Sequence, residues 1–120
     1  MMLFVGGCHQ GKSDYVNRIT GRAPVRCTPE QALSAPAIDC FHLICREILE
    51  GGGDVAAYTR TLLARNPDAV VVSDEIGLGV VPLDPFERLW REETGRALCV
   101  LAERAQRVER ICCGLGMRLK

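Results

Sequence analysis

The chain has 120 residues, and its 15 basic and 15 acidic side chains leave it with no formal net charge at pH 7. This length suits one independent core, so we expect a single domain over residues 1–120. The balanced charge gives no reason to expect a nucleic-acid partner, and no apolar run approaches the roughly 20 residues that a membrane span requires.

Cysteine is the unusual residue in this composition. Seven cysteines occur, an odd number, and no two of them form a Cys-x-x-Cys pair. Only two histidines accompany them, so the ligand spacing of a zinc site is absent. The N-terminus also has neither the positive segment nor the cleavage site of a signal peptide. We therefore expect reduced thiols and a cytoplasmic location.

The chain opens with a short apolar run, Met2–Val5, which predicts a strand. A glycine-rich stretch, Gly6–Ser13, follows it, and a helix is predicted from Lys12 to about Ile19, with Gly21 as its stop. The glycine-rich stretch has the spacing G-x-x-x-x-G-K-[ST] of a phosphate-binding loop, the Walker A motif. A chance glycine-rich turn between a strand and a helix is the alternative.

This stretch has the residue types that nucleotide binding requires. Backbone N–H groups at a helix start form a concavity for anions, and glycines let the backbone approach phosphate closely. Lys12 would contact the terminal phosphates, and the Ser13 hydroxyl would bind Mg²⁺. We expect the whole stretch to hold the nucleotide, namely Gly6, Gly7, Cys8, His9, Gln10, Gly11, Lys12 and Ser13.

Residues 21–37 contain three prolines and are predicted to be mostly loop. Within them, Val25–Cys27 could form a short edge strand and Thr28–Glu30 could open one helical turn. The stretch from Asp39 to Glu50 has apolar residues on one helical face, and Asp39 would be its N-cap.

A second helix is predicted after the cap residue Asp54 and ends at Asn66-Pro67. The run Ala69–Ser73 is β-branched and continuously apolar, which fits a central parallel strand buried on both faces. Residues 76–82 read as a loop.

The last third begins with a long helical region from about Asp84 to Arg107, in which Gly95 could bend or split the helix. Residues 108–112 are predicted to form the last strand, and residues 114–120 to turn the chain out to its end. Strands that alternate with helices imply a mostly parallel sheet flanked by helices, an α/β class consistent with a P-loop fold.

Two carboxylates, Asp74 and Glu75, follow the central strand, at the strand end where α/β sheets bind ligands. Asp74 could hold Mg²⁺ through water, and Glu75 could orient a nucleophile or hold a loop. Solvated carboxylates at a strand end are the alternative. Asp39 competes with Asp74 for the metal, although its position before a helix also fits a cap.

Three stretches carry a family resemblance. Phe4–Ser13 is similar to an opening phosphate loop, Ile38–Phe41 to an internal Asp-Cys-Leu-Thr segment, and Ser73–Pro82 to the pattern Asn-Glu-Val-Gly-x-Gly-x-Val-Pro. The likeness continues through Trp90–Glu92 and Gly114–Lys120. On these residues the chain resembles the bifunctional adenosylcobinamide kinase/adenosylcobinamide-phosphate guanylyltransferases of cobalamin biosynthesis.

The resemblance implies a RecA-like P-loop NTPase fold, a homo-oligomer and Asp39 as a carboxylate beside the metal. It also implies two reactions. In the first, a nucleoside triphosphate phosphorylates the hydroxyl of the aminopropanol arm of adenosylcobinamide. In the second, GMP passes from GTP through a guanylylated histidine to give adenosylcobinamide-GDP.

The chain departs from the family in length and in several residues. The family carries its guanylyl-accepting histidine in an Arg-Ile-x-x-His-Arg context before the position of Asp39, and this segment is missing here. His9 and His42 do not match that motif, and we interpret His42 as a surface or packed residue of its helix. Asp74 replaces an asparagine of the family, and Gln10 replaces a serine or similar residue.

The leading hypothesis is a kinase that uses ATP or GTP with Mg²⁺ to phosphorylate adenosylcobinamide, with guanylyl transfer in doubt. Lys12 and Glu75 are its candidate catalytic residues, and Ser13, Asp39 and Asp74 its candidate metal ligands. The main alternative is a nucleotide-binding regulatory or assembly subunit without turnover. A small P-loop kinase or GTPase unrelated to cobalamin is the third, and it would leave the resemblance at Ser73–Pro82 as coincidence.

Overall fold

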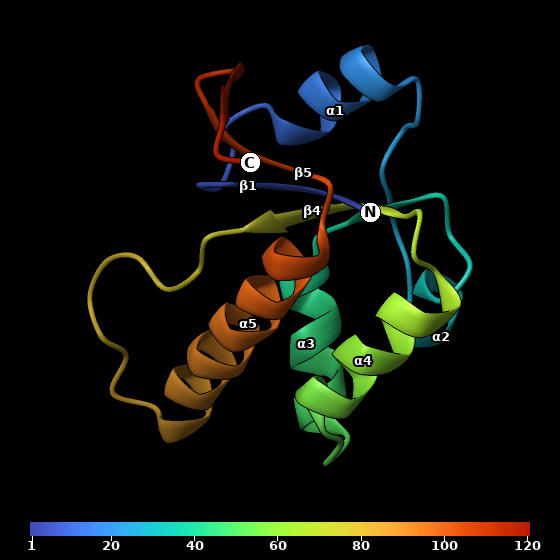
Figure 1. The fold of residues 1–120 in the computed structure, drawn as a ribbon. Coiled ribbons are helices and arrows are strands. Elements are labelled where there is room, and N and C mark those ends of the chain that lie inside the picture. Colours follow the sequence, from blue (N-terminus) through green and yellow to red (C-terminus); the bar gives the residue numbers. More distant parts are fainter.

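A six-stranded sheet separates α1 from the other long helices, as the computed structural model of residues 1–120 shows (Figure 1). The strands are β1 (Met2–Gly6), β2 (Val25–Arg26), β3 (Ala37–Asp39), β4 (Val70–Asp74), β5 (Arg107–Cys112) and β6 (Leu115–Arg118). The helices are α1 (Lys12–Thr20), α2 (Pro29–Ala32), α3 (Phe41–Glu50), α4 (Val55–Arg65) and α5 (Pro85–Arg104).

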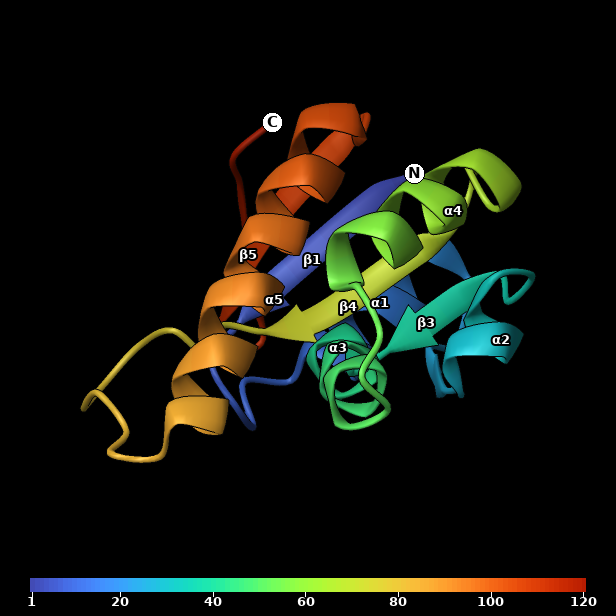
Figure 2. The ribbon, with the colours of Figure 1, turned by 90° about the horizontal axis from the view of Figure 1, so that it is seen from below.

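The strand order is β2-β3-β4-β1-β5-β6, and every pairing except that of β5 with β6 is parallel. Helices α3, α4 and α5 cover one face of this sheet, as the view from below shows (Figure 2). The α/β class and the mostly parallel sheet predicted from the sequence are confirmed. None of the helices is both long enough and apolar enough to cross a membrane.

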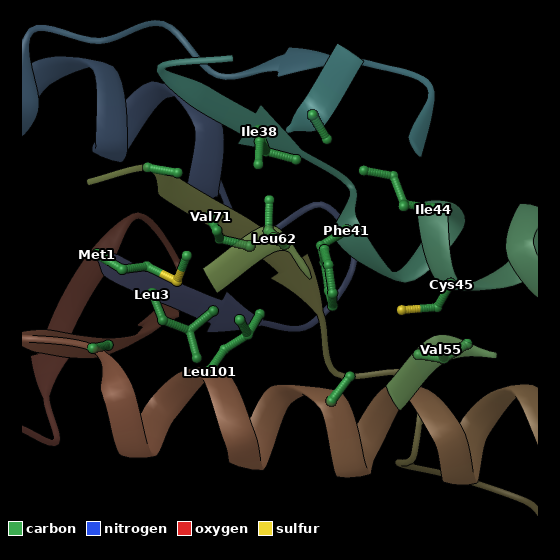
Figure 3. Close-up of a cluster of buried hydrophobic side chains, with 14 of the residues drawn as sticks. Met1, Leu3, Ile38, Phe41, Ile44, Cys45, Val55, Leu62, Val71 and Leu101 are labelled. Atoms are coloured by element: carbon green, nitrogen blue, oxygen red, sulfur yellow. The ribbon is translucent and has the colours of Figure 1, made fainter. Parts of the chain in front are cut away.

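Alternate residues of the central strands fill two separate cores. Leu3 of β1 and Val71 of β4 point to the face covered by α3, α4 and α5, where Leu101 and Phe41 join them (Figure 3). Residues such as Phe4 point to the opposite face, toward α1. Burial on both faces explains why the 69–73 run is apolar without alternation.

The weaker local predictions for residues 21–37 are confirmed. Val25 and Arg26 form β2, which is an edge strand. The helical turn is α2, where Thr28 accepts a hydrogen bond from the Gln31 backbone and the Gln31 side chain accepts one from the Thr28 backbone. This reciprocal pair is a capping box, and it explains how so short a helix begins after a loop.

Asp39 does not cap a helix, which corrects one prediction. Residues 37–39 form β3, a three-residue strand hidden in a stretch that the sequence analysis assigned to a loop and a helix start. Helix α3 begins after Cys40, which has a left-handed backbone with φ of 55° and gives no side-chain cap. Asp39 therefore ends a strand, and its carboxylate lies at the carboxyl edge of the sheet rather than over α3.

The split that the sequence left open at Gly95 does not occur, and the prediction for the C-terminus is wrong. Helix α5 runs through Gly95 without a break, because an exposed glycine inside a long helix weakens it by only about 1 kcal/mol relative to alanine. The C-terminal segment forms β6, antiparallel to β5. Cys113 and Gly114 have φ of 51° and 74°, the left-handed pair that closes a two-residue hairpin.

Candidate functional site

The glycine-rich loop between β1 and α1 has a backbone shape that depends on two glycines. A Cβ atom on Gly6 would lie 2.4 Å from the carbonyl oxygen of Ile111 on β5, so only glycine lets the two strands approach so closely. Gly11, with φ of 79°, is the N-cap of α1 and turns the chain into the helix. The loop thus ends with the first amides of α1 facing an open cavity.

This cavity has a volume of about 270 Å³ and lies at the carboxyl edge of β2, β3 and β4. Six of the eight residues predicted to hold a nucleotide line it, and the exceptions are Gly6 and Gly7. Two of the candidate carboxylates, Asp39 and Asp74, also line it. The complete lining is Cys8, His9, Gln10, Gly11, Lys12, Ser13, Asp14, Arg26, Asp39, Cys40, His42 and Asp74.

Lys12 is folded back into the loop. Its Nζ donates to the carbonyl oxygen of Gly7 at 2.6 Å and pairs with Asp74 Oδ1, also at 2.6 Å. The residue is only 8% exposed, so its ammonium is fixed at the floor of the cavity. The loop therefore holds one positive charge in place, and that charge is balanced by Asp74.

Ser13 and Asp39 form the second contact in the cavity. The Ser13 hydroxyl donates to Asp39 Oδ2 at 2.8 Å, and Asp39 Oδ1 accepts from the Cys40 backbone at 2.8 Å. A hydroxyl and a carboxylate are the hard oxygen donors that Mg²⁺ takes from a protein when substrate phosphates and waters complete its shell. These two residues fit a magnesium ion that arrives with a nucleotide.

The sequence analysis interpreted His42 as either a surface or a packed residue of its helix. The structure shows it packed, and the residue also lines the cavity. The residue is 6% exposed, and its Nδ1 accepts a hydrogen bond from the Asp74 backbone at 3.1 Å. Burial lowers the pKa of His42, while the nearby Asp74 carboxylate acts in the opposite direction. The Trp90 indole of α5 donates to the His42 carbonyl at 2.7 Å and fixes the start of α3.

Arg26 is a cavity residue that the sequence analysis missed. It pairs in register with Asp39 across β2 and β3, so both side chains arise at the same edge of the sheet. Contact with the Cys40 thiol raises the pKa of the guanidinium, and burial raises the pKa of that thiol. The predicted strand Val25–Cys27 could have indicated this position for Arg26, because the carboxyl ends of parallel strands meet at one edge of the sheet.

Glu75 lies apart from this group. Its Oε2 is 3.0 Å from Nε of Arg110 on β5, and its backbone N–H donates to the Gly6 carbonyl oxygen. Glu75 is not among the residues that line the cavity. Of the two carboxylates that follow the central strand, the structure brings only Asp74 to the loop.

The opposite side of the glycine-rich loop is tied to the β5–β6 turn. The Gln10 carbonyl oxygen accepts from Gly114 N at 2.8 Å, and the Gln10 side chain accepts from Cys113 N at 2.8 Å. Gln10, which departs from the family pattern, thus joins the loop to a hairpin that the sequence analysis did not foresee.

Comparison with known proteins gives a family. The model of the CobU family, described as cobinamide kinase / cobinamide phosphate guanyltransferase, matches residues 29–119. A bifunctional adenosylcobalamin biosynthesis protein of Pseudomonas aeruginosa, CobP, is 45% identical over 51 residues. That alignment covers 42% of this chain and 30% of the relative. Together with the strand order, the family match confirms the predicted P-loop NTPase fold.

Proposed function

The chain belongs to the CobU family, and on that premise we propose that it is a nucleotide-dependent kinase that phosphorylates adenosylcobinamide. The observation that carries the proposal is the arrangement of Lys12, Ser13 and Asp39 around one cavity at the start of α1. The family is one of transferases acting on cobinamide, whereas the nucleotide, the metal and the residue roles below are our proposals.

In this proposal the nucleotide binds with its phosphates against the first amides of α1. The helix N-terminus and the loop amides favour negative charge there, and the Lys12 ammonium adds a full positive charge. Arg26, at the end of β2, contributes a second cation to the lining of the cavity. Phosphoryl transfer depends mainly on positioning and on neutralising phosphate charge, which such a site can supply.

We assign the metal to Ser13 and Asp39, because these oxygens already meet at 2.8 Å. Bound Mg²⁺ would neutralise phosphate charge as the terminal phosphoryl group leaves. We do not assign the metal to Asp74, since its carboxylate contacts Lys12 and His42, whereas the Ser13 hydroxyl meets Asp39.

Asp74 is instead the candidate to face the acceptor hydroxyl. In the transfer, the hydroxyl oxygen forms a bond to the terminal phosphorus while the bond to the bridging oxygen breaks. The hydroxyl proton is released to a carboxylate, and a nucleoside diphosphate leaves. The role suggested by the sequence for Glu75 requires that Arg110 first release its carboxylate.

The wider proposal keeps the expected cytoplasmic location and homo-oligomer. Val80 and Leu83, in the loop that leaves the sheet after β4 (Figure 1), are 93% and 94% exposed, which supports burial against another copy. The molecular mass in solution, measured by light scattering, tests this part. A monomer at all accessible concentrations would contradict it.

The kinase proposal is tested with γ-labelled ATP and GTP, adenosylcobinamide and Mg²⁺. We expect label in the corrinoid with the parent chain and none with Lys12→Ala, while Lys120→Ala, which changes a lysine remote from the cavity, retains transfer. No transfer from either nucleotide, with nucleotide still bound, would reject the kinase and favour the regulatory or assembly subunit. Transfer to other alcohols but not to the corrinoid would favour the unrelated kinase.

A further inference from the structure

Lys12 is needed by two partners in the proposed reaction. In the structure its Nζ lies 2.6 Å from Asp74 Oδ1. If the ammonium turns to the terminal phosphates, Asp74 loses its ion pair at the moment when several negative charges enter the cavity. A carboxylate that is 20% exposed and next to phosphate requires another donor to keep its orientation.

His42 is the group that can replace Lys12. Its Nδ1 accepts the Asp74 backbone N–H at 3.1 Å, so Nδ1 carries no proton and the neutral ring is protonated at Nε2. Nε2 lies 3.7 Å from Asp74 Oδ2, too far for a hydrogen bond in this state but within reach of a small side-chain rotation. One ring is therefore bonded to the backbone of Asp74 and faces its carboxylate.

The surroundings of His42 hold the ring and leave this N–H unused. Its carbonyl oxygen accepts the Trp90 N–H, and the two ring centroids are 6.2 Å apart. The charged groups that act on the imidazole are Asp74 of β4, Lys12 of α1, Arg26 of β2 and Asp39 of β3. Among the residues that line the cavity on the α3 side, His42 alone offers a neutral N–H donor facing Asp74.

We propose that His42 is a positioning residue whose Nε2–H takes over the Asp74 carboxylate when phosphates draw Lys12 away. This inference rests on the proposed function. Before nucleotide binds, the Lys12–Asp74 pair keeps the ammonium in place. In the nucleotide complex, the His42–Asp74 contact keeps the carboxylate directed into the cavity. A neutral donor suits this exchange, because it stabilises the carboxylate without competing with Lys12 for phosphate.

The first experiment uses two variants that separate the nitrogens of the ring. An asparagine carries its amide near the position of Nδ1, and a glutamine carries its amide near that of Nε2. We expect His42→Asn to lower kcat about 10- to 100-fold, since a hydrogen bond to a charged group is lost, with little change in the KM for nucleotide. His42→Gln should recover most of that loss. Equal kcat for the parent chain and His42→Asn would overturn the inference.

The second experiment needs no variant of His42 and decides the matter if those variants do not fold. The chain has two histidines, so ¹⁵N-histidine labelling gives few resonances, and a His9→Asn variant assigns them. We expect His42 to be protonated at Nε2 in the free chain. Adding a non-hydrolysable ATP or GTP analogue with Mg²⁺ should shift Nε2 strongly and Nδ1 little.

Nucleotide binding is measured in the same samples by calorimetry. This measurement distinguishes a failure of the inference about His42 from a failure of the proposed function. Binding of the analogue with an unmoved Nε2 resonance would overturn the inference and leave the proposed function standing. No binding of either analogue would overturn the proposed function and the inference together. A shifted Nε2 with bound analogue supports the exchange even where corrinoid turnover is slow.

Discussion

The two sides of the glycine-rich loop are held in different ways. Toward β3, β4 and α3, the loop meets side chains, through the Lys12–Asp74 and Ser13–Asp39 contacts. Toward the β5–β6 hairpin, it is held by two backbone amides of the turn, which donate to the carbonyl oxygen and to the side-chain oxygen of Gln10.

This difference indicates that one side of the loop serves ligand binding and the other serves stability. Contacts made by charged side chains can exchange partners when a charged ligand enters, because a phosphate can replace a carboxylate beside Lys12 and a metal ion can bind the Asp39 carboxylate. The hydrogen bonds from the amides of the turn have no such substitute, and they keep the loop in one shape. Substitutions on the first side should therefore change activity, and substitutions on the second side should change stability.

After the complete loss expected for Lys12→Ala, the largest expected effect is at Asp39. Asp39→Asn keeps an oxygen for the Cys40 backbone but removes the charge beside Ser13. We expect kcat/KM to fall by about 10²- to 10³-fold, as when one group that stabilises transition-state charge is removed. The measurement is labelled-phosphate transfer over a range of Mg²⁺ concentrations. Asp14→Asn, in the same cavity lining but without a bond to Ser13, is the control, and an equal loss in both variants would contradict the assignment.

The second effect is on stability. Gly6→Ala would set a Cβ 2.4 Å from the Ile111 carbonyl oxygen, so β1 and β5 must move apart. We expect the free energy of unfolding to fall by about 3 kcal/mol, the upper range for overpacking. Denaturant unfolding measures it. The matched control is Gly95→Ala, where the added Cβ meets nothing within 4 Å and a helix gains stability.

A smaller effect is expected at Arg26, at the rim of the cavity. Arg26→Ala should lower kcat/KM about tenfold, because one exposed cation beside the phosphates is lost. The loss should shrink as salt concentration rises. Arg22→Ala removes a nearby arginine whose partner is the Asp68 carbonyl oxygen, outside the cavity, and should leave activity unchanged. If both arginines had equal effects, Arg26 would have no specific role.

The smallest effect is expected at Gln10. Gln10→Ala removes the acceptor of the Cys113 N–H while the backbone bond to Gly114 remains. We expect the free energy of unfolding to fall by about 1 kcal/mol, the usual value of one hydrogen bond. Thermal and denaturant unfolding measure the change, with Gln106→Ala, an exposed glutamine whose side chain makes no hydrogen bond, as control. A loss of activity without a loss of stability in Gln10→Ala would contradict the assignment of the hairpin side to stability.

Prediction from sequence succeeded where the signal was local. The spacing of Gly6–Ser13 identified the loop, the continuous apolar run identified β4, and the Asp54 cap marked the start of α4. It failed at β3, because three residues are too short for a periodic pattern and Asp39 equally suits a helix cap. It also failed at β6, because a hairpin closed by Cys113 and Gly114 lacks the usual asparagine-glycine signal.

Local sequence patterns predict the α/β class, the glycine-rich loop and three of the charged residues beside it, Lys12, Asp39 and Asp74. Which of these groups meet depends on the order of the strands in the sheet. Ser13 and Asp39 are 26 residues apart in the chain, and their 2.8 Å contact exists because β1 and β3 lie on either side of β4 in a parallel sheet. The same arrangement brings Asp74 to Lys12 and His42 and leaves Glu75 with Arg110. Strand order is a long-range property, so no local pattern at these residues could fix their roles.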